Sequence, residues 1–274
     1  KTAAVDTIRE EKDGFLIEQA GTNLVQYSEA FDNAAWVKTA SGAGQTVVVT
    51  SNYATAPDGS LTADRLIFET GGATSSDIST INQSVASVDG TGSFWLKSNS
   101  GTVTLQLIVD FDSAIYLTIT DQWQRFSTGA SGVTNDIGLR ARGHTTSNSV
   151  DILAWGAQLE QSPVATSYIP TVGSAVTRIA DKALLPVLNN VVTKEFSIFG
   201  IVSNTSTATT TGNKFIFRVP VASGFLALFY TPSNNRFSFK YDDGSADVRV
   251  SIIATENIKY FVVTVDETNV KLNI

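Results

Sequence analysis

The sequence contains no cysteine, no methionine and a single histidine. Without cysteine, a disulfide framework, a zinc–thiolate centre and a thiol nucleophile are all excluded. The histidine, His144, lies in the polar stretch 142–148, and no Gly-x-Ser-x-Gly motif accompanies it, so a Ser-His-Asp relay is not expected. Because methionine is absent, we expect Lys1 not to be a native start and the chain to be a piece of a longer polypeptide.

Positive charge and long apolar runs are also scarce. Lys and Arg number 19 against 26 Asp and Glu, which gives a formal net charge of −7, and the basic residues form no cluster. A phosphate backbone would meet net repulsion, so nucleic acid is not an expected partner. No apolar run approaches the roughly 18 to 20 residues of a membrane-spanning helix, and the first residues lack the pattern of a secretory signal. Membrane insertion and Sec export are therefore not expected.

The residues that are abundant favour strands and tight turns. The chain has 42% hydrophobic residues, 20 glycines and only 16% charged residues, and it is rich in Thr, Ser and Asn. In its first part, alternating apolar positions predict strands at 14–18, 45–50, 62–68, 78–85, 92–97, 102–110, 113–119, 123–128, 137–142 and 149–160. The segments near 27–31 and 33–36 are the candidates for a short helical turn. Strands at this spacing without long helices between them predict an antiparallel β-sandwich and not a parallel α/β sheet.

Three regions are expected along the chain. Residues 1–13 are charged and read as a linker or the end of a stalk, residues 14–180 as one sandwich, and residues 181–274 as a second. In the second sandwich the expected strands are 214–221, 224–231, 236–241, 247–253, 259–266 and 269–274, with hairpins turning at 232–235 and 242–245. The alternation still continues at Ile274, so either this domain is truncated or a partner chain covers its open edge.

Two groups of short motifs about 140 residues apart carry a family resemblance. They are Ile17-Glu18, Thr22-Asn23-Leu24 and Tyr27-Ser28-Glu29 in the first group, and Ala157-Gln158-Leu159-Glu160 with Thr166-Ser167-Tyr168-Ile169-Pro170-Thr171 in the second. In this order they resemble the opening and closing strands of the jelly-roll carbohydrate-binding modules carried on bacteriophage tail fibres and tail spikes. The second region is similar to concanavalin-like or laminin-G-like lectin sandwiches. The resemblance implies an all-β fold, a homotrimer, and binding of host surface polysaccharide by a virion protein.

The motif residues themselves are interpreted as a device that closes the first sandwich. If the first and last strands are neighbours, Glu18, Asn23, Gln158 and Glu160 satisfy backbone groups where the two segments meet. Arg178 and Asp181 are expected to pair across the same junction. We therefore expect these polar residues to serve the structure more than a ligand.

Candidates for glycan binding are aromatic and planar polar side chains on an outer face, because a sugar ring stacks on an exposed aromatic ring while its hydroxyls need polar partners. Trp36 and Trp123 are assigned to the core. Trp95 lies between Phe94 and Leu96, so a strand period of two places it on the opposite face from them. The candidate glycan-binding residues are Trp95, Gln106, Tyr116, Arg140 and Arg142.

No pair of carboxylates compels a hydrolase. Asp110 and Asp112 share one face of a strand, and Asp242 and Asp243 lie on a turn, so both pairs are interpreted as solvated and not as a glycosidase pair. Asp110, Asp112 and Asp151 were considered as calcium ligands, but their spacing matches no dense oxygen-ligand motif. We expect no enzyme activity, no catalytic residue, no metal and no cofactor.

Three functions remain open at this stage. The leading hypothesis is the non-catalytic receptor-binding part of a phage tail fibre or spike, located in the virion, with host polysaccharide, two further copies of the chain and other tail proteins as partners. The alternative is a structural connector of the virion tail that binds no glycan. The third is a capsule depolymerase domain, which requires a cleft with two carboxylates of separated pKa.

Overall fold

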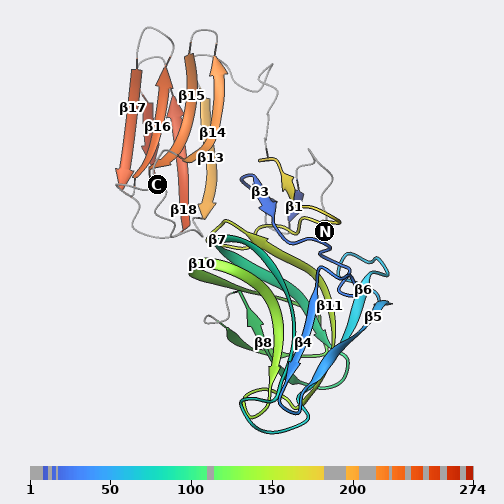
Figure 1. Cartoon of the computed structure of the whole chain (residues 1–274). Helices are drawn as coiled ribbons and strands as arrows, with labels where there is room; N and C mark the ends of the chain where they lie inside the picture. The colour runs from blue at the N-terminus through green and yellow to red at the C-terminus, as the bar shows by residue number, and fades with distance from the viewer. Residues whose placement is uncertain are drawn as a thin grey trace. The chain divides into compact units, whose positions relative to one another are not determined.

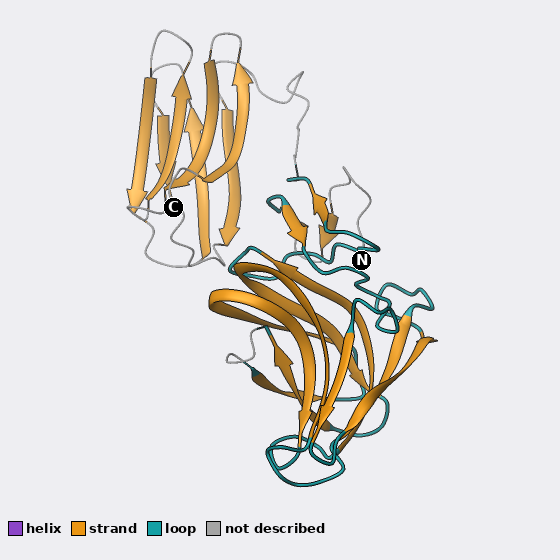
Figure 2. Ribbon diagram, in the orientation of Figure 1, coloured by secondary structure: helices purple, strands orange, loops and turns teal. Residues whose placement is uncertain are grey.

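The computed structural model describes residues 9–11, 14–16, 18–109, 114–181, 196–203, 214–221, 224–231, 236–242, 247–253, 258–265 and 270–273. All regular structure in these ranges is antiparallel β-strand, as Figure 2 shows, so the predicted all-β fold is confirmed. The same ranges contain no helix with the length and apolar character needed to cross a bilayer. The chain divides into two compact units, unit 1 at residues 1–183 and unit 2 at residues 184–274.

Unit 1 is dominated by one eight-stranded sheet. Its order is β5-β6-β11-β7-β10-β8-β9, and β4 pairs with β7 beside this path. The strands are β4 (Val37–Ser41), β5 (Gln45–Ala54), β6 (Ala63–Glu69), β7 (Ile78–Ser98), β8 (Val103–Ile108), β9 (Ile115–Ile119), β10 (Gln124–Arg142) and β11 (Ser149–Glu160). Two small sheets accompany it: β1 (Arg9–Glu11) pairs with β2 (Gly14–Leu16), and β12 (Val176–Arg178) pairs with β3 (Gly21–Asn23). β1 thus lies within the stretch 1–13.

The long strands β7 and β10 are shared between two layers. In layer 1, residues 78–84 of β7 pair with β4 on one side and with residues 136–142 of β10 on the other, followed by β8 and β9. In layer 2, residues 91–98 of β7 pair with β11, which continues to β6 and β5, and with residues 124–130 of β10. Figure 1 shows both long strands curving through unit 1. Each was predicted as two separate strands.

The two layers bury one common core. Its members come from both layers and include Leu105, Leu139, Phe94, Phe68 and Trp36, all buried. Because side chains alternate along a strand, residues next to these core positions point to the outer faces of the sandwich. Phe31 and Trp36 contribute to this core from the segment before β4, with ring centroids 4.9 Å apart.

That segment forms turns and not a helix. Ala30, Asn33 and Trp36 each donate a backbone hydrogen bond to the carbonyl three residues earlier, at 3.2, 3.2 and 3.1 Å. Each bond closes a single turn, and no continuous helical ladder follows. The helical turn considered for 27–36 is therefore absent.

Unit 2 contains two antiparallel sheets. The three-stranded sheet has the order β13-β18-β19 and the four-stranded sheet the order β14-β15-β16-β17. The strands are β13 (Phe196–Ser203), β14 (Lys214–Val221), β15 (Gly224–Thr231), β16 (Arg236–Asp242), β17 (Asp247–Ile253), β18 (Ile258–Val265) and β19 (Val270–Asn273). β15 pairs with β16 and β16 with β17, as the two predicted hairpins require. Consecutive residues 227–229 and 237–239 are buried, which fits β15 and β16 as central strands. Ile274 lies outside the described residues.

Candidate ligand-binding face

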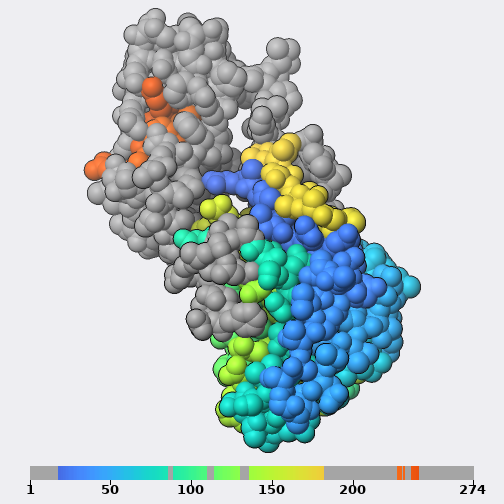
Figure 3. Space-filling model, in the orientation of Figure 1, coloured from blue at the N-terminus to red at the C-terminus, as the bar shows by residue number. Residues whose placement is uncertain are grey.

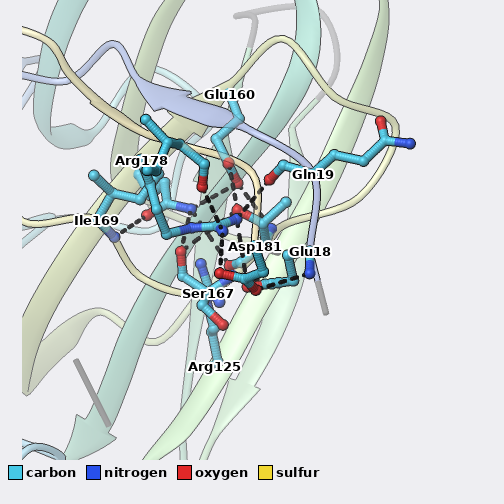
Figure 4. Close-up of polar contacts among 11 residues, drawn as sticks. Glu18, Gln19, Arg125, Glu160, Ser167, Ile169, Arg178 and Asp181 are labelled. Atoms are coloured by element: carbon cyan, nitrogen blue, oxygen red, sulfur yellow. Dashed lines mark hydrogen bonds and ion pairs between the residues drawn. The ribbon is translucent and has the colours of Figure 1, made fainter. Parts of the chain in front are cut away.

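The polar motif residues gather where unit 1 begins and ends. β12 pairs with β3 in register from Val176 opposite Asn23 to Arg178 opposite Gly21. In Figure 3 the yellow segment that follows β11 lies directly against the dark blue segment around β3. Figure 4 shows the side chains at this junction, among them Arg125 of β10, Glu160 of β11, Arg178 of β12 and residues that flank β3, β11 and β12. The predicted adjacency of the first and last strands is confirmed.

Asn23 is the best satisfied of these residues. Its side-chain amide donates to the carbonyls of Ala157 and Ile169 at 3.1 and 2.8 Å, and its oxygen accepts from the backbone N–H groups of Val25 and Leu159 at 3.1 Å each. The side chain is fully buried. All the hydrogen-bonding positions used serve the backbone, so none is left for a ligand.

Gln158 and Glu160 perform the same task on the segment after β11. The amide of Gln158 donates to the Glu160 carboxylate at 2.6 Å, and its oxygen accepts from the backbone N–H of Ile169 at 2.7 Å. Glu160 also accepts from the backbone N–H of Thr166 at 2.8 Å. Arg125 approaches from β10 and donates to the carbonyl of Thr166 at 2.6 Å. The structural interpretation of these polar residues is confirmed.

Arg178 completes the junction with two carboxylates. Its guanidinium lies 3.4 Å from Glu18 and 3.7 Å from Asp181, so the expected pair of Arg178 and Asp181 is present. Glu18 and Asp181 also exchange hydrogen bonds, since the N–H of Glu18 donates to the Asp181 side chain and the N–H of Asp181 donates to the Glu18 carbonyl, both at 2.9 Å. These contacts hold the entry and exit of unit 1 together.

Four of the five candidate glycan-binding residues share the outer face of layer 1. Across the layer, Arg140 of β10 is opposite Thr80 of β7 and Gln106 of β8, and Gln106 is opposite Tyr116 of β9. On the far side Thr80 is opposite Thr39 of β4. Because neighbouring strands lie about 4.8 Å apart, these residues form one row across five strands.

The side chains at the two ends of the row are exposed to solvent, and those in its middle are buried. Tyr116 is 55% exposed, whereas Thr80, Gln106 and Arg140 are only 3%, 4% and 8% exposed. Arg140 donates from Nε to the side-chain oxygen of Gln106 at 2.7 Å. A ligand on this part of the face would therefore contact the exposed ring of Tyr116, whereas the hydrogen-bonded Gln106 and Arg140 beside it are buried.

Arg142 lies on the same face, two residues beyond Arg140 on β10. Its backbone anchors the following loop, because its N–H donates to the hydroxyl of Thr146 at 2.7 Å and its carbonyl accepts from the N–H of Thr145 and of Thr146. Within that loop His144 is exposed and adopts a positive φ of 72°. Its exposure agrees with the predicted loop side chain.

Trp95 lies on the other layer. Phe94 and Leu96 are core residues, so the prediction that Trp95 faces away from them is confirmed. It is opposite Arg125 of β10 and Trp155 of β11 and packs with Trp123 against a small cluster that contains Trp155 and Tyr168. Arg125 and Arg140 are fifteen positions apart along β10, so the structure does not bring Trp95 together with the other four candidates.

No tryptophan is exposed. Trp36 and Trp155 are buried, and Trp95 and Trp123 are partly buried. The indole N–H of Trp123 donates to the carbonyl of Thr55 at 3.2 Å. Among the residues whose burial is described, the exposed aromatic rings are those of Tyr53 and Tyr116.

Sequence reasoning missed several residues of the layer 1 face. Thr39, Thr80 and Asn82 lie on it, as does Asp136, whose carboxylate accepts from the Asn82 amide at 3.0 Å and from the Ser84 hydroxyl at 2.7 Å. Thr80 and Asn82 occupy outward positions of the predicted strand 78–85, which was an available signal, whereas Thr39 and Asp136 lie outside every predicted strand. The sequence pattern did not indicate which strands lie next to one another in the sheet.

The remaining carboxylates give no catalytic or metal constellation in the described residues. Asp151 forms a two-point ion pair with Arg65, with contacts of 2.9 and 2.6 Å, and Arg65 holds the pKa of Asp151 below its usual range. No group of three acidic or histidine side chains in the described part of the chain could hold a metal ion. Asp110, Asp112 and Asp243 lie outside the described residues, as does the side-chain environment of Asp242.

The chain matches no protein-family profile and no curated protein sequence. Among solved structures it is similar to one titled "CBM4 structure and function", with 15% identity and a TM-score of 0.27, over 42% of this chain and 85% of that one. It is also similar to the tandem of carbohydrate-binding modules CBM22-1 and CBM22-2 from Paenibacillus barcinonensis Xyn10C, with 11% identity and a TM-score of 0.34, over 93% of this chain and 84% of that one. At these scores the assignment of an all-β sandwich depends on the strand pairing described above.

Proposed function

We propose that the outer face of layer 1 in unit 1 binds a glycan without cleaving it. The observation that carries the proposal is the row of Thr39, Thr80, Arg140, Gln106 and Tyr116, which ends in an exposed aromatic ring. A sugar can place its apolar C–H face on such a ring. Of the polar residues in the row, Thr39 is exposed to a sugar hydroxyl, whereas Thr80, Gln106 and Arg140 are buried.

The rigidity of this face supports the proposal. Gln106 and Arg140 are hydrogen-bonded to each other at 2.7 Å and nearly buried, so their positions are fixed before a ligand arrives. A preformed face loses little conformational entropy on binding. The layer is also part of a continuous sheet whose inner side packs against the core, which holds the strands of the row in place.

In the wider proposal, the chain is the receptor-binding part of a phage tail fibre or spike and recognises host surface polysaccharide from the virion. A shallow site on one face binds weakly by itself. A homotrimer presenting three copies of the face would gain affinity through effective concentration, and no additional contact would be required. The support for the phage assignment is the motif resemblance around Asn23 and Gln158, and no other observation.

A structural connector without glycan binding is the second candidate, and one observation favours it. All four tryptophans of the chain are buried or partly buried, so no exposed indole platform is available for a sugar. If this candidate is right, the layer 1 face is an ordinary polar surface and Tyr116 an isolated exposed ring.

A glycan array probed with the purified chain distinguishes the two. We expect a defined set of glycans to bind and Tyr116→Ala to lose about tenfold in affinity, which corresponds to the upper end of the free energy of one aromatic stacking contact. Tyr53→Ala is the matched control, because Tyr53 is also an exposed tyrosine, 46% exposed on β5 of layer 2, where the Arg65 guanidinium lies over its ring. Binding of no glycan, or equal losses for both variants, contradicts the proposed site. Trp95→Ala is a poorer probe because Trp95 packs against buried aromatic residues.

A further inference from the structure

The accessible part of the layer 1 face continues from Tyr116 along β9. Thr118 lies two residues further on, so it points to the same side as Tyr116, and it is opposite Thr104 of β8. Thr118 is exposed and Thr104 is half-buried. Gln106 and Arg140, in the row beside Tyr116, are buried. A ligand on the Tyr116 ring therefore finds accessible neighbours in the direction of Thr118.

The loop that follows β10 lies against this end of β8. The N–H of Ser147 donates to the carbonyl of Thr104 at 3.1 Å, and the N–H of Thr104 donates to the hydroxyl of Ser147 at 2.9 Å. Tyr116 and Ser147 are therefore separated by about 7 Å along the strands and about 10 Å across them. A single sugar ring is too small to contact both, whereas an oligosaccharide can extend from Tyr116 to the loop.

The loop presents His144 from a fixed backbone. On one side of His144 the N–H of Gly143 donates to the carbonyl of Asp77 at 2.7 Å, and on the other the N–H of Thr146 donates to the carbonyl of Arg142 at 3.1 Å. The His144 side chain itself is exposed. Because the loop is already held in place, a ligand that contacts His144 would lose little conformational entropy in ordering it.

The backbone of His144 is strained. Three described residues other than glycine have a positive φ, namely Tyr27 at 51°, Asn52 at 52° and His144 at 72°. The first two are held by bonds within the fold, since the N–H of Tyr27 donates to the Val172 carbonyl at 2.6 Å and the N–H of Asn52 to the Asp64 carboxylate at 2.8 Å. Among the described residues, the imidazole of His144 has no hydrogen-bond partner. Strained non-glycine residues are concentrated at ligand sites, which directs attention to this side chain.

We propose that His144 is the second glycan contact of the layer 1 face and a determinant of its specificity. Its two ring nitrogens can donate or accept hydrogen bonds, so the imidazole can bind a hydroxyl of a sugar that neighbours the one stacked on Tyr116. This inference rests on the proposed glycan binding. It adds a residue that selects among glycans and the requirement that the ligand is an oligosaccharide.

One test uses the parent protein without substitution. Because the chain has a single histidine, protein labelled with ¹³C-histidine gives one imidazole signal in its NMR spectrum. The probe is a hexasaccharide of the glycan that gives the strongest signal on the array. We expect the imidazole signal to shift on titration and to saturate at the dissociation constant that calorimetry gives. An unchanged signal at saturating hexasaccharide overturns the inference.

Variants measure the contribution of the contact. We expect His144→Gly to bind the hexasaccharide about fivefold more weakly, as for the loss of one hydrogen bond, and to bind a broader set of glycans on the array. Glycine adopts a positive φ without strain, so the Tm of this variant should not fall. Asn52→Gly is the matched control, because it relieves the same kind of strain on β5 of layer 2 and keeps the N–H that Asp64 accepts. Its affinity and its array profile should equal those of the parent.

Each alternative result has a distinct meaning. If His144→Gly keeps the affinity and the array profile of the parent while Tyr116→Ala binds more weakly, the inference is overturned and glycan binding stands. Equal weakening by His144→Gly and Asn52→Gly shows a general effect of relieving backbone strain and also overturns the inference. Binding of no glycan by the parent overturns the proposed function itself.

Discussion

The rings of Trp155 and Tyr168 pack together with their centroids 4.4 Å apart and their planes tilted by 53°. Trp155 belongs to β11, and Tyr168 belongs to the segment that leads from β11 to β12, so this contact fastens the closing segment onto layer 2. Both side chains are largely buried, and the Tyr168 hydroxyl lies 2.6 Å from the Ser28 hydroxyl and 2.9 Å from the Glu29 carboxylate. The opening and closing motifs thus share one aromatic and hydrogen-bonded contact.

Tyr168→Phe should destabilise unit 1 by about 1–2 kcal/mol, because the ring packing remains while a buried hydroxyl that serves two partners is lost. Burial raises the pKa of Tyr168 well above its ordinary value, so the effect should be the same from pH 6 to pH 9. Urea unfolding followed by tryptophan fluorescence measures it. This probe reports on unit 1 alone, since all four tryptophans lie within residues 1–183. A loss that varies with pH in this range would contradict the assignment.

Asn23→Asp should destabilise unit 1 by about 3 kcal/mol or more at pH 7. The substitution replaces an amide that donates to two carbonyls with a buried carboxylate facing them. Asn33→Asp is the matched control, because Asn33 uses its side-chain oxygen to accept from the N–H of Ala35 at 2.9 Å, and a carboxylate can do the same. The free energies of unfolding of both variants are compared by urea titration. Equal losses would show that the polar junction contributes nothing specific.

Stability should rise by about 1 kcal/mol between pH 7 and pH 5 because of Asp64. This buried side chain accepts from the N–H groups of Phe31 and Asn52 at 2.8 Å each, and burial raises its pKa to about 6 from an ordinary value of 3.8. As the pH falls through 6, the folded state takes up a proton that the unfolded state takes up only near 3.8, so the folded state gains stability. As the pH rises through 6 that contribution is lost.

The measurement for Asp64 is the difference between two proteins. Asp64→Asn keeps the size of the side chain and cannot titrate, so its unfolding free energy should lack this rise. Asp77 and Asp151 have pKa values lowered by their hydrogen-bond partners and therefore titrate below this range. Parallel curves for the parent chain and for Asp64→Asn between pH 5 and pH 7 would refute the explanation.

Gly156→Ala should cost more than Gly101→Ala, although both glycines have left-handed backbones with φ of 63° and 65°. In each variant the left-handed conformation of the alanine lowers the free energy of unfolding by about 1–2 kcal/mol. At Gly156 the added methyl would also lie 3.2 Å from Trp95 and 3.4 Å from Tyr168, whereas at Gly101 nothing lies within 4 Å. We expect an additional loss of about 1 kcal/mol at Gly156, measured by urea unfolding. Equal losses of unfolding free energy for the two variants would mean that Trp95 and Tyr168 make room for the added methyl without a measurable energetic penalty.

The sequence pattern predicted most of the longer strands of unit 1 but not their continuity, and it missed β3, β4 and β12. Alternation correctly placed Phe94 and Leu96 in the core and Trp95 outside it. Ile81 is also a core residue of β7, however, so the inward positions change from odd to even numbers along one strand. The register of β7 and β10 shifts between Ala130 and Asp136, where the two strands pass from layer 2 to layer 1. Where the inward positions change from odd to even numbers, the alternation of apolar and polar residues is interrupted, and in the sequence this interruption resembles a loop. The pattern therefore predicted two strands in place of each long one.

The junction was more predictable than the candidate binding face. A polar residue in a short motif, such as Asn23, must find partners once it is buried, and that rule leads to the hydrogen bonds observed. The face depends on the lateral order β4-β7-β10-β8-β9, which is set by pairings between distant segments. Gln106 and Arg140 were identified as outward-facing, but their mutual hydrogen bond and their low exposure follow only from that order.

The pairing of β3 with β12 determines how unit 1 would respond to tension along the chain. Glu18 precedes β3 and Asp181 follows β12, so both attachment points are at the same end of this short antiparallel pair. A force that pulls the two flanking segments apart would first break the contacts among Glu18, Asp181 and Arg178. It would then separate β3 from β12 one paired position at a time, because both ends are pulled from the same side of the pair. The eight-stranded sheet would carry no force until β3 and β12 had separated.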